Sequence, residues 1–288
     1  MPDVLQSALQ SWSMPRWFSI ACILTAILYA RGWQKIRQSR PELFPVWRLW
    51  CFLSGLLALW LAVASPLAEL DDFLLLAHMT QHLVLMSLAP PLVLLGTPVV
   101  PLLRGIPQPV MRRGVAPLFS SGFLPWLARA LTNPIFAWLA MNIAYVGWHV
   151  PAAFELALRS PAWHEVEHGC FFFTSLLFWF AVIQPWPSQA RWSRWAMLPY
   201  LLSADIVNTG VAAFLTFCGR VLYPSYALAP RISSLTPLND QVAAGALMWV
   251  LGSFAFLIPT AMITMRLLSP ELKQSSATAS EIPSFASQ

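Results

Sequence analysis

Charge is the scarcest property of this 288-residue sequence. Only 10% of its residues are charged, whereas 58% are hydrophobic, and its mean hydropathy is +0.62. A soluble globular domain carries about 25% charged residues, so this balance excludes an ordinary soluble domain. The composition therefore predicts a membrane protein.

Cysteine is also scarce, and the sequence has no C-x-x-C pair. The four cysteines are scattered inside or at the ends of apolar stretches, at Cys22, Cys51, Cys170 and Cys218. We interpret them as buried small side chains, with a thiol relay as the alternative. The sequence also lacks a basic groove or an interleaved aromatic stripe, which argues against nucleic acid as a partner.

Seven apolar stretches are long enough to cross a hydrocarbon core of roughly 30 Å as helices. They cover about 17–30, 46–66, 73–98, 134–149, 163–184, 195–218 and 241–265. The predicted fold class is all-α, a polytopic bundle of seven transmembrane helices in the lipid bilayer. Residues 1–268 would form this single domain, and the Ser- and Ala-rich residues 269–288 a disordered cytoplasmic tail. The pair Pro90-Pro91 is expected to break the third span.

Lysine and arginine orient the predicted bundle, because short cytoplasmic loops collect them. Thirteen of the 17 basic residues lie after the first, third, fifth and seventh spans, which predicts an outside N-terminus and a cytoplasmic C-terminus. The basic cluster follows the first apolar stretch instead of preceding it, so we expect a retained span rather than a signal peptide. Residues 107–132 are expected to be amphipathic and to lie at the membrane interface.

Histidine is rare but unevenly placed. The five are His78, His82, His149, His164 and His168, and four of them form i, i+4 pairs in HMTQH and HEVEH. On a helix this spacing puts both side chains on one face. In the predicted topology all five lie in the outer half of the membrane, where such groups are costly unless they face the bundle interior, a cavity or one another. The pattern therefore predicts a site for a metal or for haem.

A methionine and three carboxylates lie near the histidines in the sequence. Met86 follows His82 by four residues, and imidazole with thioether suits copper, especially Cu(I), although methionine is also a common core residue. Glu69, Asp71 and Asp72 precede the third span. They would either attract cations to the outer mouth or form a solvated loop.

HEVEH also satisfies the H-E-x-x-H pattern of zinc peptidases. In that interpretation the protein is an intramembrane zinc hydrolase, and Glu165 is its general base. Its third ligand would come from His78, His82, His149 or Asp205. A further alternative is haem held by paired histidines on different helices. HMTQH repeats the histidine spacing without a glutamate at that position, which favours a metal-binding protein that is not an enzyme.

Four segments together resemble a known family. They are HMTQHLVLMSLAPPLVLLGTP (78–98), WHVP (148–151), HEVEHGCFFFTSLLFW (164–179) and LYPSYALAPRISSLTPLNDQVAAGALMW (222–249). They are similar to the motifs of the CtaG-type (caa3-type) cytochrome c oxidase assembly factors, and the resemblance runs from about 46 to 266. It implies seven transmembrane helices in a bacterial inner membrane. It also implies a role in maturing a haem-copper cytochrome c oxidase by copper delivery or insertion, with the oxidase subunits as partners.

The resemblance implies a set of site residues as well. The matching positions are His78, Met79, Gln81, His82, Trp148, His149, His164, Glu167, His168, Asp240 and Gln241. We expect the five histidines to be copper ligands and Met79 or Met86 to offer a softer position. Gln81, Glu167, Asp240 and Gln241 would surround them, with Glu167 or Asp240 orienting an imidazole. Five imidazoles exceed what one Cu(I) ion needs, which leaves room for two positions or a relay.

Overall fold

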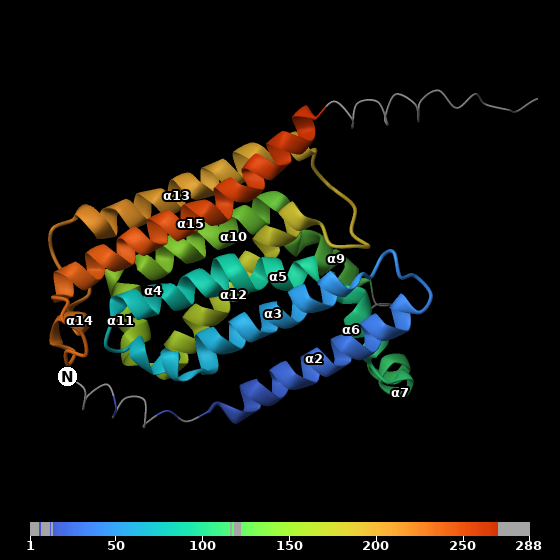
Figure 1. Ribbon diagram of the computed structural model, residues 1–288, viewed down its shortest axis with the longest axis horizontal. Coiled ribbons are helices and arrows are strands. Elements are labelled where there is room, and N and C mark those ends of the chain that lie inside the picture. Colours follow the sequence, from blue (N-terminus) through green and yellow to red (C-terminus); the bar gives the residue numbers. More distant parts are fainter. Residues whose placement is uncertain (1–5, 7–11, 13, 116, 118–121, 270–288) are drawn as a thin grey trace, which may run out of the picture.

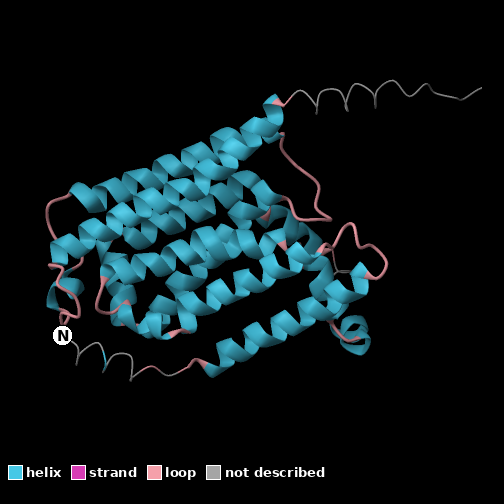
Figure 2. Ribbon diagram, viewed as in Figure 1, coloured by secondary structure: helices cyan, strands magenta, loops and turns pink. Residues whose placement is uncertain are grey.

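The computed structural model describes residues 6, 12, 14–115, 117 and 122–269. Within these residues every regular element is a helix (Figure 1, Figure 2). The all-α prediction is therefore confirmed. The predicted tail, apart from its first residue, lies outside the described residues.

Long helices form the body of the bundle. They are α2 (Arg16–Arg37), α3 (Val46–Ala64), α10 (Pro134–His149), α12 (Pro161–Ile183), α13 (Met197–Phe217) and α15 (Pro237–Leu268). A further rod consists of α4 (Leu75–Leu83), the π-helical η2 (Val84–Leu88) and α5 (Ala89–Leu95). The shorter elements are η1 (Pro66–Leu70), α6 (Val99–Gly105), α7 (Gln108–Val110), η3 (Met111–Val115), α9 (Phe123–Leu131), α11 (Pro151–Arg159), η4 (Arg194–Ala196) and α14 (Pro224–Leu228).

Five helical stretches are long and apolar enough to cross a membrane. They are Val46–Leu70, Leu75–Leu95, Pro161–Ile183, Arg194–Phe217 and Pro237–Leu268. The helix α10 has the bounds predicted for the fourth span, but its 16 residues reach only about 24 Å at 1.5 Å per residue. The helix α2 carries basic residues in its last turns, including Lys35 and Arg37. Neither α10 nor α2 is among the five stretches.

Large apolar side chains cover the outside of the bundle. Ile143, Phe173 and Ile206, on three different helices, are 67%, 64% and 71% exposed. Soluble proteins rarely expose large contiguous apolar surfaces, whereas the hydrocarbon of a bilayer matches them. Together with the five apolar helices, this surface is that of a membrane protein.

The third predicted span is interrupted just before its prolines. Pro90 has no N–H with which to bond the carbonyl of Met86, four residues earlier. That carbonyl instead accepts a hydrogen bond from Trp179 Nε1 of α12 at 2.8 Å, and the preceding turn is π-helical. The rod continues through Pro91, so the expected break is a π-turn supported by a neighbouring helix.

The helix α2 is tied to the bundle through α6. A Cβ atom added at Gly32 of α2 would meet the backbone of Pro101, and one added at Gly105 of α6 would meet the backbone of Leu28. Only glycine permits backbones to approach this closely. Near the other end of α2, Phe18 lines a cavity of about 790 Å³ that α3 and α12 also border.

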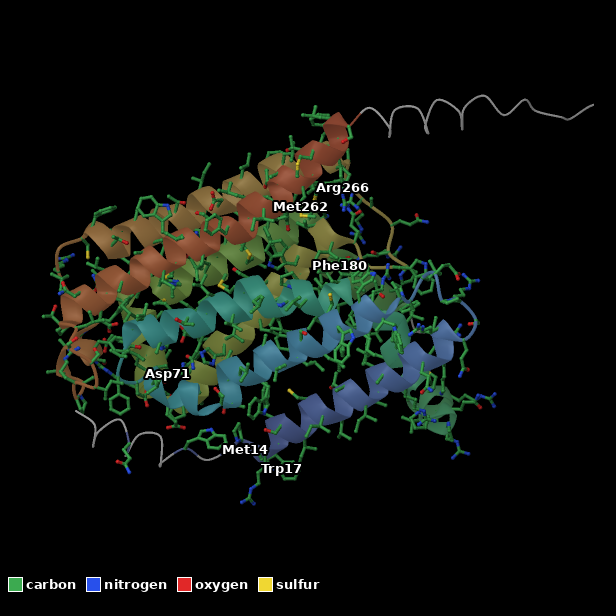
Figure 3. The ribbon with its side chains drawn as sticks, in the orientation of Figure 1. Met14, Trp17, Asp71, Phe180, Met262 and Arg266 are labelled. Atoms are coloured by element: carbon green, nitrogen blue, oxygen red, sulfur yellow. The ribbon has the colours of Figure 1, made fainter. Side chains whose placement is uncertain are left out.

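Ten of the 16 buried polar residues among those described gather at the end of the bundle that carries α11 and α14 (Figure 1). Figure 3 shows Asp71 at this end and Arg266 at the opposite end. The buried group comprises Asp71, His78, Gln81, His82, His149, Glu155, Glu167, His168, Asp240 and Gln241. Burial of so many polar groups requires compensating partners.

Candidate metal centre

Three helices bring the five histidines together. His78 and His82 lie on α4, His149 is the last residue of α10, and His164 and His168 lie in the first turns of α12. The ring centroids are 4.4 Å apart for His78 and His82, and 4.2 Å for His164 and His168. Between helices they are 5.1 Å apart for His78 and His164, and 6.0 Å for His82 and His149. The rings thus form one cluster.

Asp240 fixes the start of the helix that carries two of these histidines. Its Oδ2 accepts from the backbone N–H of Leu75 at 2.8 Å, and its Oδ1 from that of Leu76 at 3.1 Å. The N-cap residue of α4, Leu74, provides no side-chain cap, so a carboxylate of α15 satisfies the exposed N–H groups in its place. Asp240 therefore positions α4 itself.

Hydrogen bonds set the tautomer of two histidines. His149 Nδ1 lies 2.7 Å from the carbonyl oxygen of Tyr145, and because a carbonyl only accepts, Nδ1 carries the proton. The hydroxyl of Tyr226 donates to the carbonyl oxygen of Asp71 at 2.8 Å. At 3.1 Å that hydroxyl therefore accepts from Nδ1 of His78. Both rings present an unprotonated Nε2, the form that binds a metal.

Glu167 is the acidic residue of HEVEH that faces the cluster. It is fully buried, with Oε2 3.6 Å from Nε2 of His78 and Oε1 3.7 Å from Nε2 of His82. These separations are long for hydrogen bonds, and they approach the roughly 3.4 Å between two ligand atoms that each lie about 2.0–2.1 Å from one tetrahedral ion. Glu165 is exposed and lines the cavity instead.

Buried polar atoms without a hydrogen-bond partner are concentrated at this cluster. Among the described residues they include Nε2 of His78, both ring nitrogens of His82, Nε2 of His149, His164 and His168, and both carboxylate oxygens of Glu167. Folded proteins leave few such atoms, since each costs about 1–3 kcal/mol. Eight of them converge here, and imidazole and carboxylate are the donors that a metal cation requires.

The ligand atoms form two overlapping groups. His78, His82 and His168 make one, and Asp71, His78 and His164 make the other; within each group the atoms lie within 4.8 Å of one another. We call the first the inner position and the second the outer position. The inner position is all imidazole and buried, the outer position includes a carboxylate, and His78 belongs to both.

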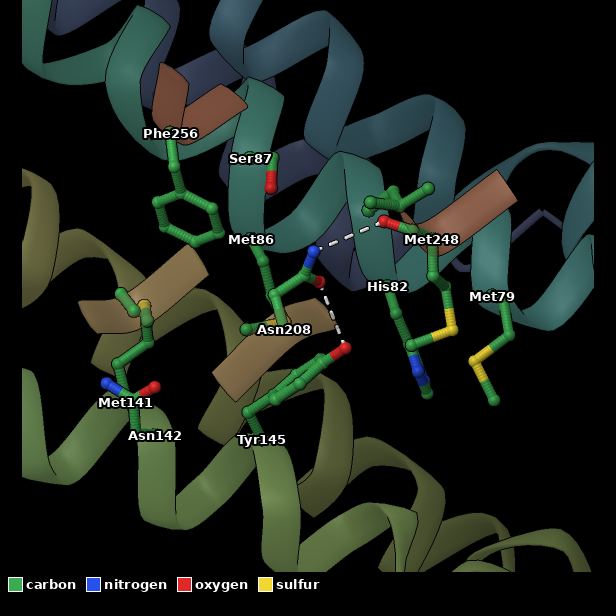
Figure 4. Close-up of a pocket in the computed structure, with 12 residues that line it drawn as sticks. Met79, His82, Met86, Ser87, Met141, Asn142, Tyr145, Asn208, Met248 and Phe256 are labelled. Atoms are coloured by element: carbon green, nitrogen blue, oxygen red, sulfur yellow. Dashed lines mark hydrogen bonds between the residues drawn. The ribbon is translucent and has the colours of Figure 1, made fainter. Parts of the chain in front are cut away.

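Four methionines surround a small pocket beside His82 (Figure 4). Met79, Met86, Met141 and Met248 line it together with His82. Its volume is about 20 Å³, roughly the space of one water molecule. The two methionines predicted as softer ligands thus lie in a thioether-lined pocket next to the inner position.

The two glutamines of the predicted set brace the backbone. Gln81 Nε2 donates to the carbonyl oxygen of Ala62 at 3.0 Å, which joins α4 to α3. Gln241 Oε1 accepts from the N–H of Leu222 at 2.7 Å, and its Nε2 donates to the carbonyl oxygen of Arg220 at 3.0 Å. They hold the helices around the histidines.

The helix α14 supplies a residue of the site, Tyr226, that was not predicted from the sequence. Glu155 of α11 accepts hydrogen bonds from the Ser225 N–H at 3.0 Å and hydroxyl at 2.6 Å, and from Arg159 at 2.9 Å. Burial raises the pKa of Glu155, but the bonds from Ser225 and Arg159 outweigh that effect and lower it. This anchor holds α14, and with it Tyr226, against the cluster. The two tyrosines of the segment LYPSY (222–226) were the feature of the sequence that could have indicated it.

Asp71 was recognised in the sequence only as a residue that could attract cations. The structure buries it to 4% exposure and places its Oδ2 3.6 Å from Nε2 of His164. Burial, followed by the charge of Asp72, raises the pKa of the Asp71 carboxyl to about 8. A carboxyl held in this way is stabilised in its charged form by a nearby cation.

The structure also shows the surroundings of residues that matter for the zinc-hydrolase and haem interpretations. Asp205, a candidate third zinc ligand, lines a separate groove between α13 and α15 and belongs to neither ligand group. Phe154 and Phe171 pack against His78 and His82 with ring centroids 4.8 and 4.4 Å apart. Aromatic rings thus pack directly against two of the five imidazoles.

Comparison with known proteins gives one family. A family model described as cytochrome c oxidase caa3 assembly factor matches residues 27–269. Uncharacterized proteins of Mycobacterium bovis and Mycobacterium tuberculosis are each 27% identical over 289 residues, which cover 97% of this chain and 42% of the relative. One of Mycobacterium leprae is 27% identical over 255 residues, 83% of this chain and 36% of the relative. The chain thus spans less than half the length of these relatives. No solved structure matches it significantly.

Proposed function

This chain belongs to the cytochrome c oxidase caa3 assembly factor family, and we propose that it binds copper in the histidine cluster for insertion into a haem-copper oxidase. One observation carries the proposal. Eight buried nitrogen and oxygen atoms of five imidazoles and one carboxylate converge without hydrogen-bond partners among the described residues. A cation bound among them would compensate their desolvation.

The inner position is the proposed resting place of the ion. His78, His82 and His168 supply three neutral nitrogens, and Glu167 offers a buried negative charge beside two of them. Imidazole together with thioether suits Cu(I), and Met79 and Met86 line the adjoining pocket. Copper is cargo in this proposal, so the protein is an assembly factor rather than an enzyme.

We also propose seven membrane spans, with the N-terminus outside and the C-terminus in the cytoplasm of a bacterium. The two additional spans are α2 and α10. The helix α10 packs between α12 and α13, both of which are long enough to cross a membrane. The basic segments would then lie inside, and the histidine end of the bundle would face outward. This orientation would present the copper site on the outer side of the inner membrane.

The segment before α10 fits a position at the membrane interface. In α9, Phe123 and Trp126 are 59% and 57% exposed, and their rings lie 6.0 Å apart. Exposed aromatic side chains beside Arg129 on one short helix are typical of helices that lie in the headgroup region.

The copper content of purified full-length protein tests the proposal. After anaerobic loading with Cu(I) in detergent and desalting, the wild-type protein should retain about one ion per chain. His82→Ala and His168→Ala should each retain much less, because each removes one of the three inner nitrogens, and metal affinity falls steeply with a lost ligand.

Glu165→Gln is the matched control. Glu165 lies on the same helix but is exposed, so this variant should retain copper at the wild-type level and should still support oxidase assembly. Unchanged copper content in both histidine variants would contradict the proposal. Loss of oxidase assembly in Glu165→Gln with full copper content would instead favour a zinc hydrolase.

A further inference from the structure

A cavity of about 790 Å³ opens beside the histidine cluster. Its apolar walls include Phe18 of α2, Leu59 of α3 and Phe172 of α12. Its ionisable lining consists of four carboxylates and two imidazoles, from Glu69, Asp71, Asp72, His164, Glu165 and His168. No lysine or arginine is among its described lining residues. The cavity therefore favours cations over anions.

The outer position lies where this cavity meets the cluster. Asp71 and His164 both line the cavity, and they form a ligand group with His78, which is fully buried. The Nε2 atoms of His164 and His78 have no hydrogen-bond partner among the described residues. The cavity is thus lined by two of the three outer ligands, Asp71 and His164, but by only one inner ligand, His168; His82, which completes the inner position, does not line it.

The two positions share one ligand residue, His78. Tyr226 holds Nδ1 of His78, so this ring has only Nε2 to offer to either position. One lone pair binds one ion at a time. The inner and outer positions therefore alternate, and a single ion can move between them while His78 stays bound.

We propose that Asp71, His78 and His164 form a loading position that takes a copper ion from the cavity and passes it to the inner position. The step is a ligand exchange: the Asp71 oxygen and the His164 nitrogen leave, and the nitrogens of His82 and His168 bind. The copper keeps its oxidation state, and no other reactant is needed. This inference rests on the proposed function, to which it adds an entry route and Asp71 as a ligand.

The rate of copper uptake tests the loading position. Full-length protein in detergent is mixed anaerobically with the coloured Cu(I) complex of bicinchoninate, and the loss of colour gives both the uptake rate and the final capacity. Asp71→Asn should slow uptake by about tenfold or more. Loss of an anionic ligand that contributes about 1.4 kcal/mol to binding at the outer position lowers the occupancy of that position about tenfold. Its final capacity should stay at the wild-type level.

Asp72→Asn is the control for general attraction of cations. Asp72 lines the same cavity but is exposed and is not a member of a ligand group. Because salt screens exposed charges, its substitution should slow uptake by less than about twofold. An equal slowing by Asp71→Asn and Asp72→Asn would overturn the loading position, because the effect would then be one of charge alone.

His164→Ala provides a second test that does not depend on Asp71. Its side chain is 23% exposed at the cavity, so the substitution leaves the fold intact more readily than one at buried Asp71, and it should slow uptake similarly. Wild-type uptake rates in folded Asp71→Asn or His164→Ala would overturn the loading position and leave the proposed function standing. A wild-type protein that takes up no copper would overturn the proposed function itself.

Discussion

The chemistry of the cluster depends on where individual protons lie. A carbonyl oxygen of Tyr145 and the hydroxyl of Tyr226 hold the protons of His149 and His78 on Nδ1. Their Nε2 lone pairs point into the cluster, where His78 meets the carboxylate of Glu167. A lone pair facing a carboxylate is unfavourable unless a cation or a proton lies between them. We therefore expect the Glu167 carboxylate to strengthen metal binding and to destabilise the metal-free protein.

Glu167→Gln should separate these two effects. The amide removes a buried charge and can donate to an imidazole nitrogen, so the metal-free protein should become more stable. A gain of about 1 kcal/mol would raise the unfolding temperature by about 2–4 °C in a protein of this size. The same substitution should weaken Cu(I) binding by about tenfold or more, in line with other residues around metal ligands. Thermal unfolding of metal-free protein and a competitive Cu(I) titration measure the two quantities.

Glu165→Gln is the control on the same helix and should change neither quantity by much. If Glu167→Gln bound Cu(I) as tightly as the wild-type protein, Glu167 would have no part in the metal site. If it lowered the unfolding temperature instead, the carboxylate would be satisfied in the metal-free protein, contrary to its contacts here.

Residue spacing made part of the site predictable. The i, i+4 pairs placed four histidines on two helix faces because helical periodicity is local in sequence. The role of Asp240 could not be found in this way, because its partner Leu75 lies 165 positions away. The same holds for Tyr226 and His78, which are 148 positions apart.

At the scale of elements, the rod of α4, η2 and α5 is held at both ends of the part formed by α4 and η2. Asp240 bonds the first N–H groups of α4, and Trp179 bonds the carbonyl that Pro90 leaves free. These bonds come from α15 and α12. The rod that carries His78 and His82 is thus positioned by α15, which packs against α4, and by α12, which packs against η2 and α5.

Asp240→Ala should loosen this rod. It leaves one buried and one partly buried N–H group without acceptors, and hydrogen bonds to a charged group contribute about 1.5–3 kcal/mol. The free energy of unfolding in detergent should fall by about that amount, and Cu(I) affinity should fall with it. Asn239→Ala is the control, because Asn239 is exposed one residue earlier and should change stability by less than about 0.5 kcal/mol. Equal effects of the two substitutions would mean that the cap does not position α4.

Element boundaries were predictable where local signals mark them. The helix α10 has the bounds predicted for the fourth span, and local signals mark both of its ends: Asn133 caps it before Pro134, and Pro151 follows it. The interruption of the third span was predicted at the prolines but lies one turn earlier. The carbonyl that Pro90 leaves free there accepts a hydrogen bond from Trp179, a tertiary partner that no local pattern reveals.

At the scale of the whole molecule, the site lies at one end of a bundle with an apolar exterior. Composition was sufficient to predict helices and a membrane, because both follow from average hydropathy. The cavity was not predictable. It depends on where α2 lies, and the glycine contacts of Gly32 and Gly105 that fix α2 against α6 are contacts between segments far apart in sequence. The proposed entry route therefore follows from the arrangement of helices and not from any one motif.

The most direct test of the central claim is copper K-edge X-ray absorption on the Cu(I)-loaded full-length protein. The histidine cluster predicts a first coordination shell dominated by nitrogen or oxygen at about 2.0–2.1 Å, with the multiple scattering of imidazole rings. In His82→Ala the shell should lose an imidazole, or the copper should be lost. A shell made of sulfur alone at about 2.3 Å, or a shell unchanged by His82→Ala, would contradict the account.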